Sequence, residues 1–308
     1  MPRVGVIGAT GAVGRVVAEL LAERGFDDVR LFASARSAGT ELDGRVVEEA
    51  TPEALSAGDL DVCFFSVGSK ASRELVPHAV RGGALCVDKS EAFRLQDGIP
   101  LVVPEVNGGR ALEHAGIVAN PNCCSIPLSL VLKPLQDEAG LRAVRVATYQ
   151  SASGKGARRL QQLLDEPQAE HDLSADWDFD GEEFDEETKI REETRKILEL
   201  PDLPMSATCV RVPVLVGHSE SVWVETEEPL AAARTREVLA AAPSVRVEDF
   251  PTPRAAAGGD EVLVGRIRPD RAGDGLSLHL ACDNLRKGAA LNGIQIAELV
   301  LSQRRVAA

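Results

Sequence analysis

Residues 4–14 read VGVIGATGAVG, a short apolar run followed by a turn with glycine at positions 8, 11 and 14. Such a turn needs glycine because the backbone turns tightly and lets a pyrophosphate approach the free N–H groups of the following helix. Apolar residues at helical spacing predict that helix over residues 14–24. A strand, a glycine turn and a helix in this order predict a Rossmann-like dinucleotide-binding domain.

The next hundred residues continue the alternation of strands and helices that is typical of a parallel, doubly wound sheet. After residue 122 the pattern changes to one helix and several β-type runs, which predict an α+β domain with a mixed or antiparallel sheet covered by helices. The expected strands are 3–7, 29–32, 62–66, 84–87, 143–149, 207–214, 221–225 and 276–282, and the expected helices are 14–24, one ending at 77–81, 126–138 and 288–304. The last helix is amphipathic and is expected to pack back on the first domain. We therefore predict one domain from residues 1–121 plus 289–308 and a second from 122–288.

Composition excludes several classes of protein. The chain has 308 residues, 44% of them hydrophobic, so it can bury a core and is not disordered as a whole. Its net charge of −14, without a basic cluster interleaved with aromatic residues, argues against nucleic acid or an anionic membrane surface as a partner. No apolar run reaches about 18 residues and no secretory leader is evident, so we expect a cytoplasmic protein without a membrane span.

Most of the negative charge lies in one segment. Residues 165–193 carry fourteen acids and two bases, a local net charge of −12 that leaves −2 for the rest of the chain. The simplest interpretation is a solvated surface, and we expect this charge to face solvent rather than a pocket. Asp176-x-Asp178-x-Asp180-Gly181-x5-Glu187 also satisfies the spacing of a calcium-binding loop, although Glu183 stands where such loops favour an apolar residue. We assign no metal, and calcium stays an open alternative.

The residues after the second strand, Ala33-Ser34-Ala35-Arg36-Ser37, bear on the choice of cofactor. A NAD-preferring site usually places an acid here for the ribose hydroxyls. Two hydroxyls and a guanidinium suit a 2′-phosphate instead, so the sequence favours NADP over NAD. The alternative is that Ser34, Arg36 and Ser37 are polar surface residues without a role in binding.

One cysteine of the six is the candidate nucleophile. Cys63, Cys86, Cys209 and Cys282 lie in apolar runs and are expected to be buried, and the spacings of the cysteines match no metal site. Cys123 lies in Asn120-Pro121-Asn122-Cys123-Cys124-Ser125, just before an expected helix. A thiol at a helix N-terminus has its pKa lowered by the helix dipole and becomes a thiolate nucleophile at neutral pH.

With these motifs in order along almost the whole chain, the sequence resembles the aspartate-β-semialdehyde dehydrogenase family. The matching stretches are 8–14, 33–39, 100–107, 120–123, 148–150, 209–214, 217–219, 264–268 and 283–290. The resemblance implies a Rossmann-like NADP-binding domain and a catalytic and dimerisation domain. It also implies a homodimer or a dimer of dimers, and a step of the aspartate pathway towards lysine, methionine and threonine.

The resemblance further implies a phosphorylating aldehyde dehydrogenase that interconverts β-aspartyl phosphate and aspartate β-semialdehyde, with inorganic phosphate as the second substrate. Cys123 would form a thioester, His218 would act as acid and base, and Gln150 would position the reacting carbonyl. Substrate would be held by Arg211 at the α-carboxylate and Glu186 at the α-ammonium, and the phosphate by Lys189 and Arg94 with Asn122 nearby. The expected cofactor contacts are Gly8, Thr10, Gly11, Ala12, Val13, Ser34, Arg36, Ser37, Ser66, Gly68, Ser153, Gly154 and Asn284.

Two stretches depart from the family pattern. Glu91 falls where a serine commonly helps to bind phosphate, and an acid beside a phosphate dianion is unfavourable. The stretch from about 158 to 184 is some thirty residues shorter than usual, and the acidic run occupies its place. Alternatives therefore remain open: a related acyl phosphate such as N-acyl-γ-glutamyl phosphate as substrate, or a non-catalytic nucleotide-binding redox sensor that uses Cys123 and Cys124.

Overall fold

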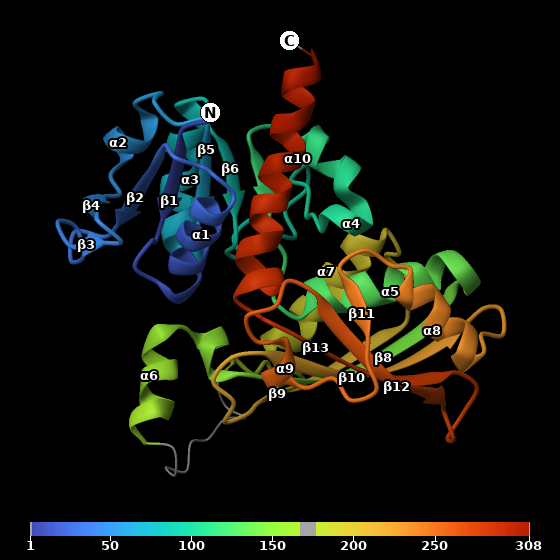
Figure 1. Cartoon of the computed structure of the whole chain (residues 1–308). Coiled ribbons are helices and arrows are strands. Elements are labelled where there is room, and N and C mark those ends of the chain that lie inside the picture. The colour runs from blue at the N-terminus through green and yellow to red at the C-terminus, as the bar shows by residue number, and fades with distance from the viewer. Residues whose placement is uncertain (1, 167–176, 308) are drawn as a thin grey trace. The chain divides into compact units, whose positions relative to one another are not determined.

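The computed structural model describes residues 2–166 and 177–307, which fold into two compact units. One unit comprises Met1–Pro121 with Ala289–Ala308, and the other comprises Asn122–Gly288. Figure 1 shows that each unit is built from a sheet with helices packed on it. Among the described residues no helix is long and apolar enough to cross a membrane.

The first unit is a seven-stranded sheet in the order β3-β4-β2-β1-β5-β6-β7. All of its pairings are parallel except the short β3–β4 pair. Its strands are β1 (Val4–Ile7), β2 (Val29–Ala33), β3 (Glu41–Leu42), β4 (Arg45–Glu49), β5 (Val62–Phe65), β6 (Leu85–Asp88) and β7 (Ile117–Ala119). The chain runs outward from β1 through β2 to β4 and then returns to β5 on the other side of β1. The carboxyl ends of β1 and β5 therefore form the switch point at which doubly wound sheets bind their ligands.

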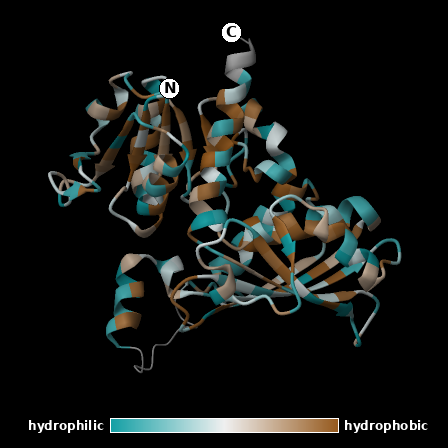
Figure 2. Cartoon of the chain, viewed as in Figure 1, coloured by the Kyte–Doolittle hydropathy of each residue, from teal (hydrophilic) through white to brown (hydrophobic). Residues whose placement is uncertain are grey.

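Helices cover this sheet, and the C-terminal helix is one of them. The helices of the unit are α1 (Ala12–Glu23), α2 (Pro52–Ser56), α3 (Ser69–Arg81), α4 (Pro104–Asn107), a 3₁₀ helix (Gly108–Glu113) and α10 (Leu291–Ala307). Ile294, Ile296 and Val300 of α10 are buried in one cluster with apolar residues of β1, β5 and β6. Figure 2 shows the apolar strands of the unit between more polar helix surfaces. The C-terminal helix thus completes the core of the N-terminal unit.

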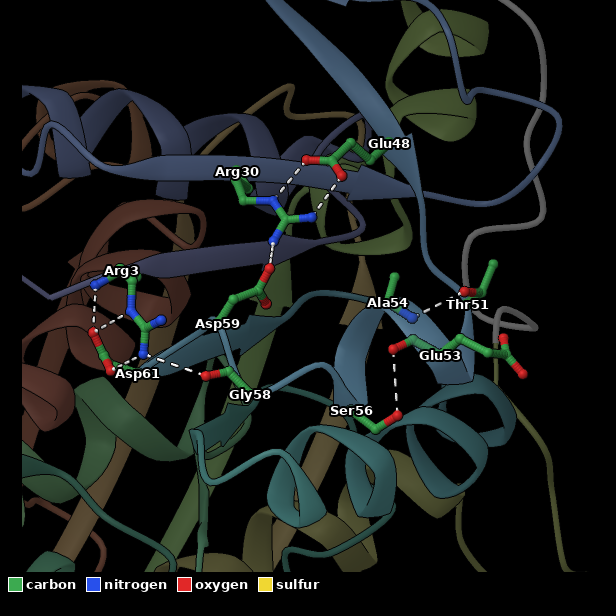
Figure 3. A network of polar contacts seen from close by, with 10 residues as sticks. All are labelled: Arg3, Arg30, Glu48, Thr51, Glu53, Ala54, Ser56, Gly58, Asp59 and Asp61. Atoms are coloured by element: carbon green, nitrogen blue, oxygen red, sulfur yellow. Dashed lines mark hydrogen bonds and ion pairs between the residues drawn. The ribbon is translucent and has the colours of Figure 1, made fainter.

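A polar network lies at the opposite, amino-terminal edge of the β1, β2 and β5 strands (Figure 3). The Arg30 guanidinium contacts both carboxylate oxygens of Glu48, at 2.8 and 2.7 Å, and Asp59 at 2.5 Å. Arg3 pairs with Asp61 at 2.8 Å. These side chains are a third to a half exposed, so water screens each pair and its contribution to stability is small.

The second unit is a six-stranded mixed sheet in the order β11-β12-β13-β10-β8-β9. Its strands are β8 (Leu141–Gln150), β9 (Met205–Arg211), β10 (His218–Thr226), β11 (Val245–Val247), β12 (Val262–Pro269) and β13 (Leu276–Cys282). Its helices are α5 (Ser125–Ala139), α6 (Ala157–Asp165), α7 (Asp185–Leu198), α8 (Ala232–Ala240), α9 (Pro253–Ala256) and a 3₁₀ turn (Ala152–Lys155). Helix α5 packs on the central strands, α7 on β9 and α8 on β11 and β12. One face of the sheet is therefore covered by helices.

The predicted α/β architecture is confirmed, with a mixed second sheet. Several elements differ from the sequence prediction. The strand expected over 207–214 begins at Met205 and ends at Arg211. Strands β3, β4, β7, β11 and β12 were not predicted, and the acidic run, in which no clear helix was expected, contributes the fourteen-residue helix α7. Cys63, Cys86, Cys209 and Cys282 are buried free thiols, as predicted.

Candidate active site

Strand register in the second unit brings three of the expected site residues to one end of its sheet. Gln150 at the end of β8 pairs with Arg211 at the end of β9, and His218 begins β10 beside them. All three side chains are at most 3% exposed, because residues at alternate positions of each strand point to the helix-covered face. The last residues of β8 and β9 and the first of β10 thus form the floor of a site.

The candidate nucleophile lies directly against the histidine. Cys123 precedes α5, and its Sγ is 3.2 Å from Nε2 of His218. The pKa of the Cys123 thiol is lowered well below its ordinary value, mainly by its interaction with the Cys124 thiol, and further by His218 and Arg211, against the effect of burial. This shift favours the thiolate form of Cys123, and its role as the nucleophile stays a prediction.

Hydrogen bonds to Ser151 fix the orientation and tautomer of the His218 ring. The backbone N–H of Ser151 donates to Nδ1 of His218 at 3.0 Å. Because a backbone N–H can only donate, Nδ1 must accept, and the proton of the neutral ring then lies on Nε2. That N–H points at the Cys123 sulfur, so it stabilises a thiolate there. The same N–H can donate to a substrate oxygen that becomes negative beside the sulfur.

The same tautomer bears on metal binding. One donor atom from each of Cys123, Cys124 and His218 lies within 4.8 Å of the others. A histidine ligand needs an unprotonated nitrogen towards the metal. Since the Ser151 N–H occupies Nδ1, the nitrogen that faces the two sulfurs is the protonated one, and the arrangement suits thiolate chemistry better than metal coordination.

A buried carboxylate lies next to this pair. Glu186, in the first turn of α7, is 7% exposed, and its Oε1 accepts from Asn122 Nδ2 at 2.9 Å and from Gln150 Nε2 at 3.1 Å. Burial and the negative charge of Cys123 raise the pKa of Glu186, although the two amide donors oppose that shift. A cation such as a substrate ammonium would favour the ionised form of Glu186.

Arg211 supplies a buried positive charge on the other side of Gln150. Its Nη1 donates to Gln150 Oε1 at 3.3 Å and to the Ser151 carbonyl oxygen at 3.1 Å. Its guanidinium also lies against the ring of Trp177, with Cζ 4.6 Å from the ring centroid. Arg211 and Glu186 together provide one cationic and one anionic group, the pattern that recognises an α-amino acid.

Three residues expected at the cofactor line the same end of the sheet. Asn284 Nδ2 donates to Ser153 Oγ at 3.0 Å, and Asn284 Oδ1 accepts from the Gly217 N–H at 2.9 Å. A Cβ added at Gly154 would lie 2.9 Å from Arg211 Nη1 and 3.0 Å from the His218 ring. Position 154 therefore requires glycine because its backbone runs directly against two site side chains.

The two cations expected at the phosphate lie in different units. Lys189 is on α7, three residues after Glu186, and its Nζ contacts Asp185 Oδ2 at 2.6 Å. Arg94, in the first unit, is 8% exposed and donates to the carbonyl oxygens of Lys89 at 2.6 Å and Asn120 at 3.1 Å. These contacts fix both cations in place, and their role towards phosphate stays a prediction.

The expectation that the acidic run faces solvent is wrong for part of it. Glu187 and Glu193 of α7 are 8% and 1% exposed. Glu187 accepts from the backbone N–H groups of Phe184 and Cys209, at 2.9 and 2.8 Å, and Glu193 accepts from that of Asn122 at 2.6 Å. Like Glu186, these acids are buried because donors of the site region meet them, whereas Asp178, Asp180 and Glu182 are exposed.

These contacts also bear on the calcium alternative. Its first ligand, Asp176, lies outside the described residues. Its last, Glu187, would need both carboxylate oxygens for the ion, but each already accepts a backbone N–H. Asp180 Oδ1 accepts the N–H groups of Glu182 and Glu183 in a tight turn. These carboxylate oxygens accept backbone N–H groups instead of forming a cage for a cation.

In the first unit, the glycine turn forms a backbone cradle at the switch point. Gly8 has φ +87°, and a Cβ there would lie 2.5 Å from the Ser66 carbonyl oxygen, while one at Gly14 would lie 2.1 Å from that of Gly8. Helix α1 begins after Gly11 without a side-chain cap, so its first N–H groups can bind an anion. Thr10, Ala12 and Val13 form this turn, Ser66 and Gly68 follow β5, and Ser34, Arg36 and Ser37 follow β2, with Ser34 and Arg36 exposed. This geometry fits a dinucleotide.

Sequence reasoning did not identify several residues that shape the site. Ser151 sets the tautomer of His218, Trp177 covers Arg211, and Glu193 holds the backbone next to Cys123. Glu220, on β10 two residues after His218, is fully buried, and neither of its carboxylate oxygens has a hydrogen-bond partner among the described residues. Alternation along β10 was the one available signal for Glu220, because it places residues 218 and 220 on the same face.

Comparison with known proteins identifies the relatives of this chain. Residues 3–115 match the family described as "Semialdehyde dehydrogenase, NAD binding domain", and residues 132–287 match "Semialdehyde dehydrogenase, dimerisation domain". The aspartate-semialdehyde dehydrogenase of Streptomyces akiyoshiensis is 45% identical over 337 residues, covering 98% of this chain and 99% of that protein.

Solved structures agree with these matches. Aspartate semialdehyde dehydrogenase II of Vibrio cholerae, complexed with ASA, has a TM-score of 0.92 and 37% identity, covering 98% of each chain. The aspartate semialdehyde dehydrogenase of Candida albicans with NADP has a TM-score of 0.81 and 26% identity, covering 99% of each chain. The relatives thus share both the fold and the full extent of the chain.

Proposed function

The chain belongs to the aspartate-semialdehyde dehydrogenase family, and we propose that it is an NADP-dependent, phosphorylating enzyme that interconverts β-aspartyl phosphate and aspartate β-semialdehyde. The observation that carries the proposal is the Cys123 sulfur 3.2 Å from His218 Nε2, beside the buried pair Arg211 and Glu186. The contact between Cys123 and His218 suits a nucleophilic thiolate. The buried charges of Arg211 and Glu186 suit the carboxylate and the ammonium of an α-amino acid.

In the direction of aldehyde synthesis, the Cys123 thiolate attacks the carbonyl carbon of the acyl phosphate. The carbon–oxygen bond to phosphate breaks, phosphate leaves with that electron pair, and a thioester forms on Cys123. Lys189 and Arg94 stabilise the departing dianion. NADPH, when bound, would supply the hydride that reduces the thioester carbon; the carbon–sulfur bond then breaks, the aldehyde leaves, and sulfur keeps the electron pair as the Cys123 thiolate.

His218 serves mainly as an acid in this scheme. Its Nε2–H points at the sulfur, so it stabilises the thiolate before attack and donates to the carbonyl oxygen that becomes negative after it. Gln150 holds both substrate-binding groups in place, since its amide joins Glu186 to Arg211. Asn122 completes the hydrogen bonding of Glu186.

NADP rather than NAD is supported by the residues after β2. Ser34, Arg36 and Ser37 offer hydroxyls and a guanidinium at the edge where a ribose 2′-phosphate would lie. The Candida albicans relative was solved with NADP. We further infer a cytoplasmic enzyme of the route to lysine, methionine and threonine.

A homodimer or a dimer of dimers is also part of the proposal. It is supported by the match of residues 132–287 to a dimerisation domain. The face of the second sheet opposite α5 carries a hollow of about 530 Å³ lined by Arg145, Thr208 and Trp223 among others. Light scattering on the purified chain measures the mass directly, and a monomer at micromolar concentration would rule the dimer out.

The test of the activity is phosphate-dependent reduction of NADP⁺ with aspartate semialdehyde. We expect turnover that requires phosphate, is abolished in Cys123→Ala and is kept in Cys86→Ala, which removes a buried thiol of β6 in the first unit. Turnover that survives Cys123→Ala contradicts the thioester mechanism. Faster turnover of N-acetylglutamate semialdehyde than of aspartate semialdehyde would assign the substrate to the related acyl phosphate instead.

A further inference from the structure

One aromatic side chain covers the cation that we place at the substrate carboxylate. The Trp177 ring lies over the Arg211 guanidinium, with Cζ 4.6 Å from the ring centroid. Arg211 is 3% exposed. An arginine stacked on an indole is attracted to the ring face, and this attraction strengthens as water is excluded.

The ring itself is held by a small aromatic cluster. Trp177 and Phe184 have ring centroids 6.0 Å apart, and Phe179 meets Phe184 edge-on at 5.4 Å. Phe179 and Phe184 also form an isolated β-bridge, and the Asp185 N–H donates to the Asp178 carbonyl oxygen at 2.9 Å. The turn 178–185 thus connects Trp177 directly to the start of α7.

That connection joins the two groups that select the substrate. Helix α7 carries Glu186 in its first turn, and Phe184 is its N-cap residue. The segment that positions the anionic group therefore also positions the ring that covers the cationic one. A guanidinium packed against a ring face has less freedom to rotate, so its donors keep the position that a carboxylate needs.

We propose that Trp177 is a positioning residue that holds the Arg211 guanidinium for the α-carboxylate of the substrate, and that it thereby selects aldehydes that carry this group. Trp177 contacts Arg211 and not the reacting atoms, so it affects recognition and not the chemical step. The inference rests on the proposed function, because it takes an α-amino acid semialdehyde as the ligand of Arg211.

The experiment compares two aldehydes that differ only in the α-carboxylate: aspartate semialdehyde and 3-aminopropanal. A stacked cation contributes about 0.5–2 kcal/mol, so Trp177→Ala should lower kcat/KM for aspartate semialdehyde about 2- to 30-fold, through KM. The same variant should leave kcat/KM for 3-aminopropanal unchanged. Trp177→Phe keeps a ring over the guanidinium and should recover most of the loss.

Phe250→Ala is the matched control, because Phe250 is an exposed aromatic residue of the second unit, 77% exposed, and does not belong to this aromatic cluster. It should leave both aldehydes unaffected. Equal losses for the two aldehydes in Trp177→Ala, or no loss for either, would overturn the inference. A wild-type protein that turns over neither aldehyde would refute the proposed function, and the inference would fall with it.

Discussion

Replacing Glu220 with glutamine should change how stability depends on pH. Burial raises the pKa of the Glu220 carboxyl well above its ordinary value, and the charge of Cys123 adds to the shift. The folded protein therefore keeps this proton to a higher pH than the unfolded chain, which loses it near pH 4.5. Above that pH folding must take up a proton, so the free energy of unfolding of the wild type falls by about 1.4 kcal/mol per pH unit until the folded pKa is reached.

Glutamine has the same shape and no titration, so the stability of Glu220→Gln relative to the wild type should rise by about 1.4 kcal/mol for each pH unit above 5, and level off at the folded pKa. Urea unfolding followed by tryptophan fluorescence measures this difference. The signal reports on the second structural unit, which contains Glu220, because both tryptophans of the chain, Trp177 and Trp223, lie there.

The control is Glu225→Gln on the same strand. Glu225 pairs with Arg145, which lowers the pKa of its carboxyl, so its effect on stability is complete above pH 4.5 and is lost only as the pH falls further. The difference in the free energy of unfolding between Glu225→Gln and the wild type should be constant from pH 5 to pH 7. A constant gap for Glu220→Gln over the same range would refute the reasoning, since it would mean that Glu220 is ionised in the folded protein.

Three further outcomes are expected. Arg36→Ala should raise the KM for NADP⁺ about 10- to 100-fold, the effect of losing one charge-assisted hydrogen bond, while the KM for NAD⁺ stays unchanged in steady-state assays. Gly154→Ala should lower kcat/KM at least about tenfold with little change in Tm, because its methyl group displaces Arg211 and His218 by less than about 1 Å. Since the pKa of Cys123 is lowered, iodoacetamide should inactivate the wild type almost as fast at pH 6.5 as at pH 8, whereas in Cys124→Ala, which removes the largest cause of the shift, the alkylation rate should rise with pH.

Local sequence signals were sufficient for β1, β2, β5 and β6 of the first unit because each follows one simple rule, but they did not predict its strands β3, β4 and β7. The glycines of the turn are required by close backbone contacts, and the strands are continuous apolar runs because both faces of a parallel sheet are buried. The roles of His218, Arg211 and Glu186 came from the family resemblance, whereas Cys123 was also indicated by its position just before a helix. The structure adds a physical reason for grouping them. The ends of β8 and β9 lie beside the start of β10, which brings Arg211 and His218 to one end of the sheet.

Other elements left no clear signal. Strand β12 changes register between Gly265 and Arg268, and Arg266 has φ +53°, so the regular alternation of a strand is broken in its middle. Helix α7 was missed because its acids give it the composition of a solvated surface. The donors that make its burial favourable are the backbone N–H groups of residues 122 and 209, which are far away in the sequence.

Part of the negative charge of residues 165–193 has a structural role in α7. Glu193 fixes the backbone N–H of Asn122, the residue before the nucleophile, and Glu187 fixes that of Cys209, two residues before Arg211. Glu186, in the same first turn as Glu187, accepts from the side-chain amide of Asn122. One helix thus fixes the backbone next to the predicted nucleophile and the backbone near Arg211, and it also carries Glu186, which we propose as the ammonium-binding group. Apolar residues in place of Glu187 and Glu193 would leave those buried N–H groups without acceptors, at a cost of about 1–3 kcal/mol each.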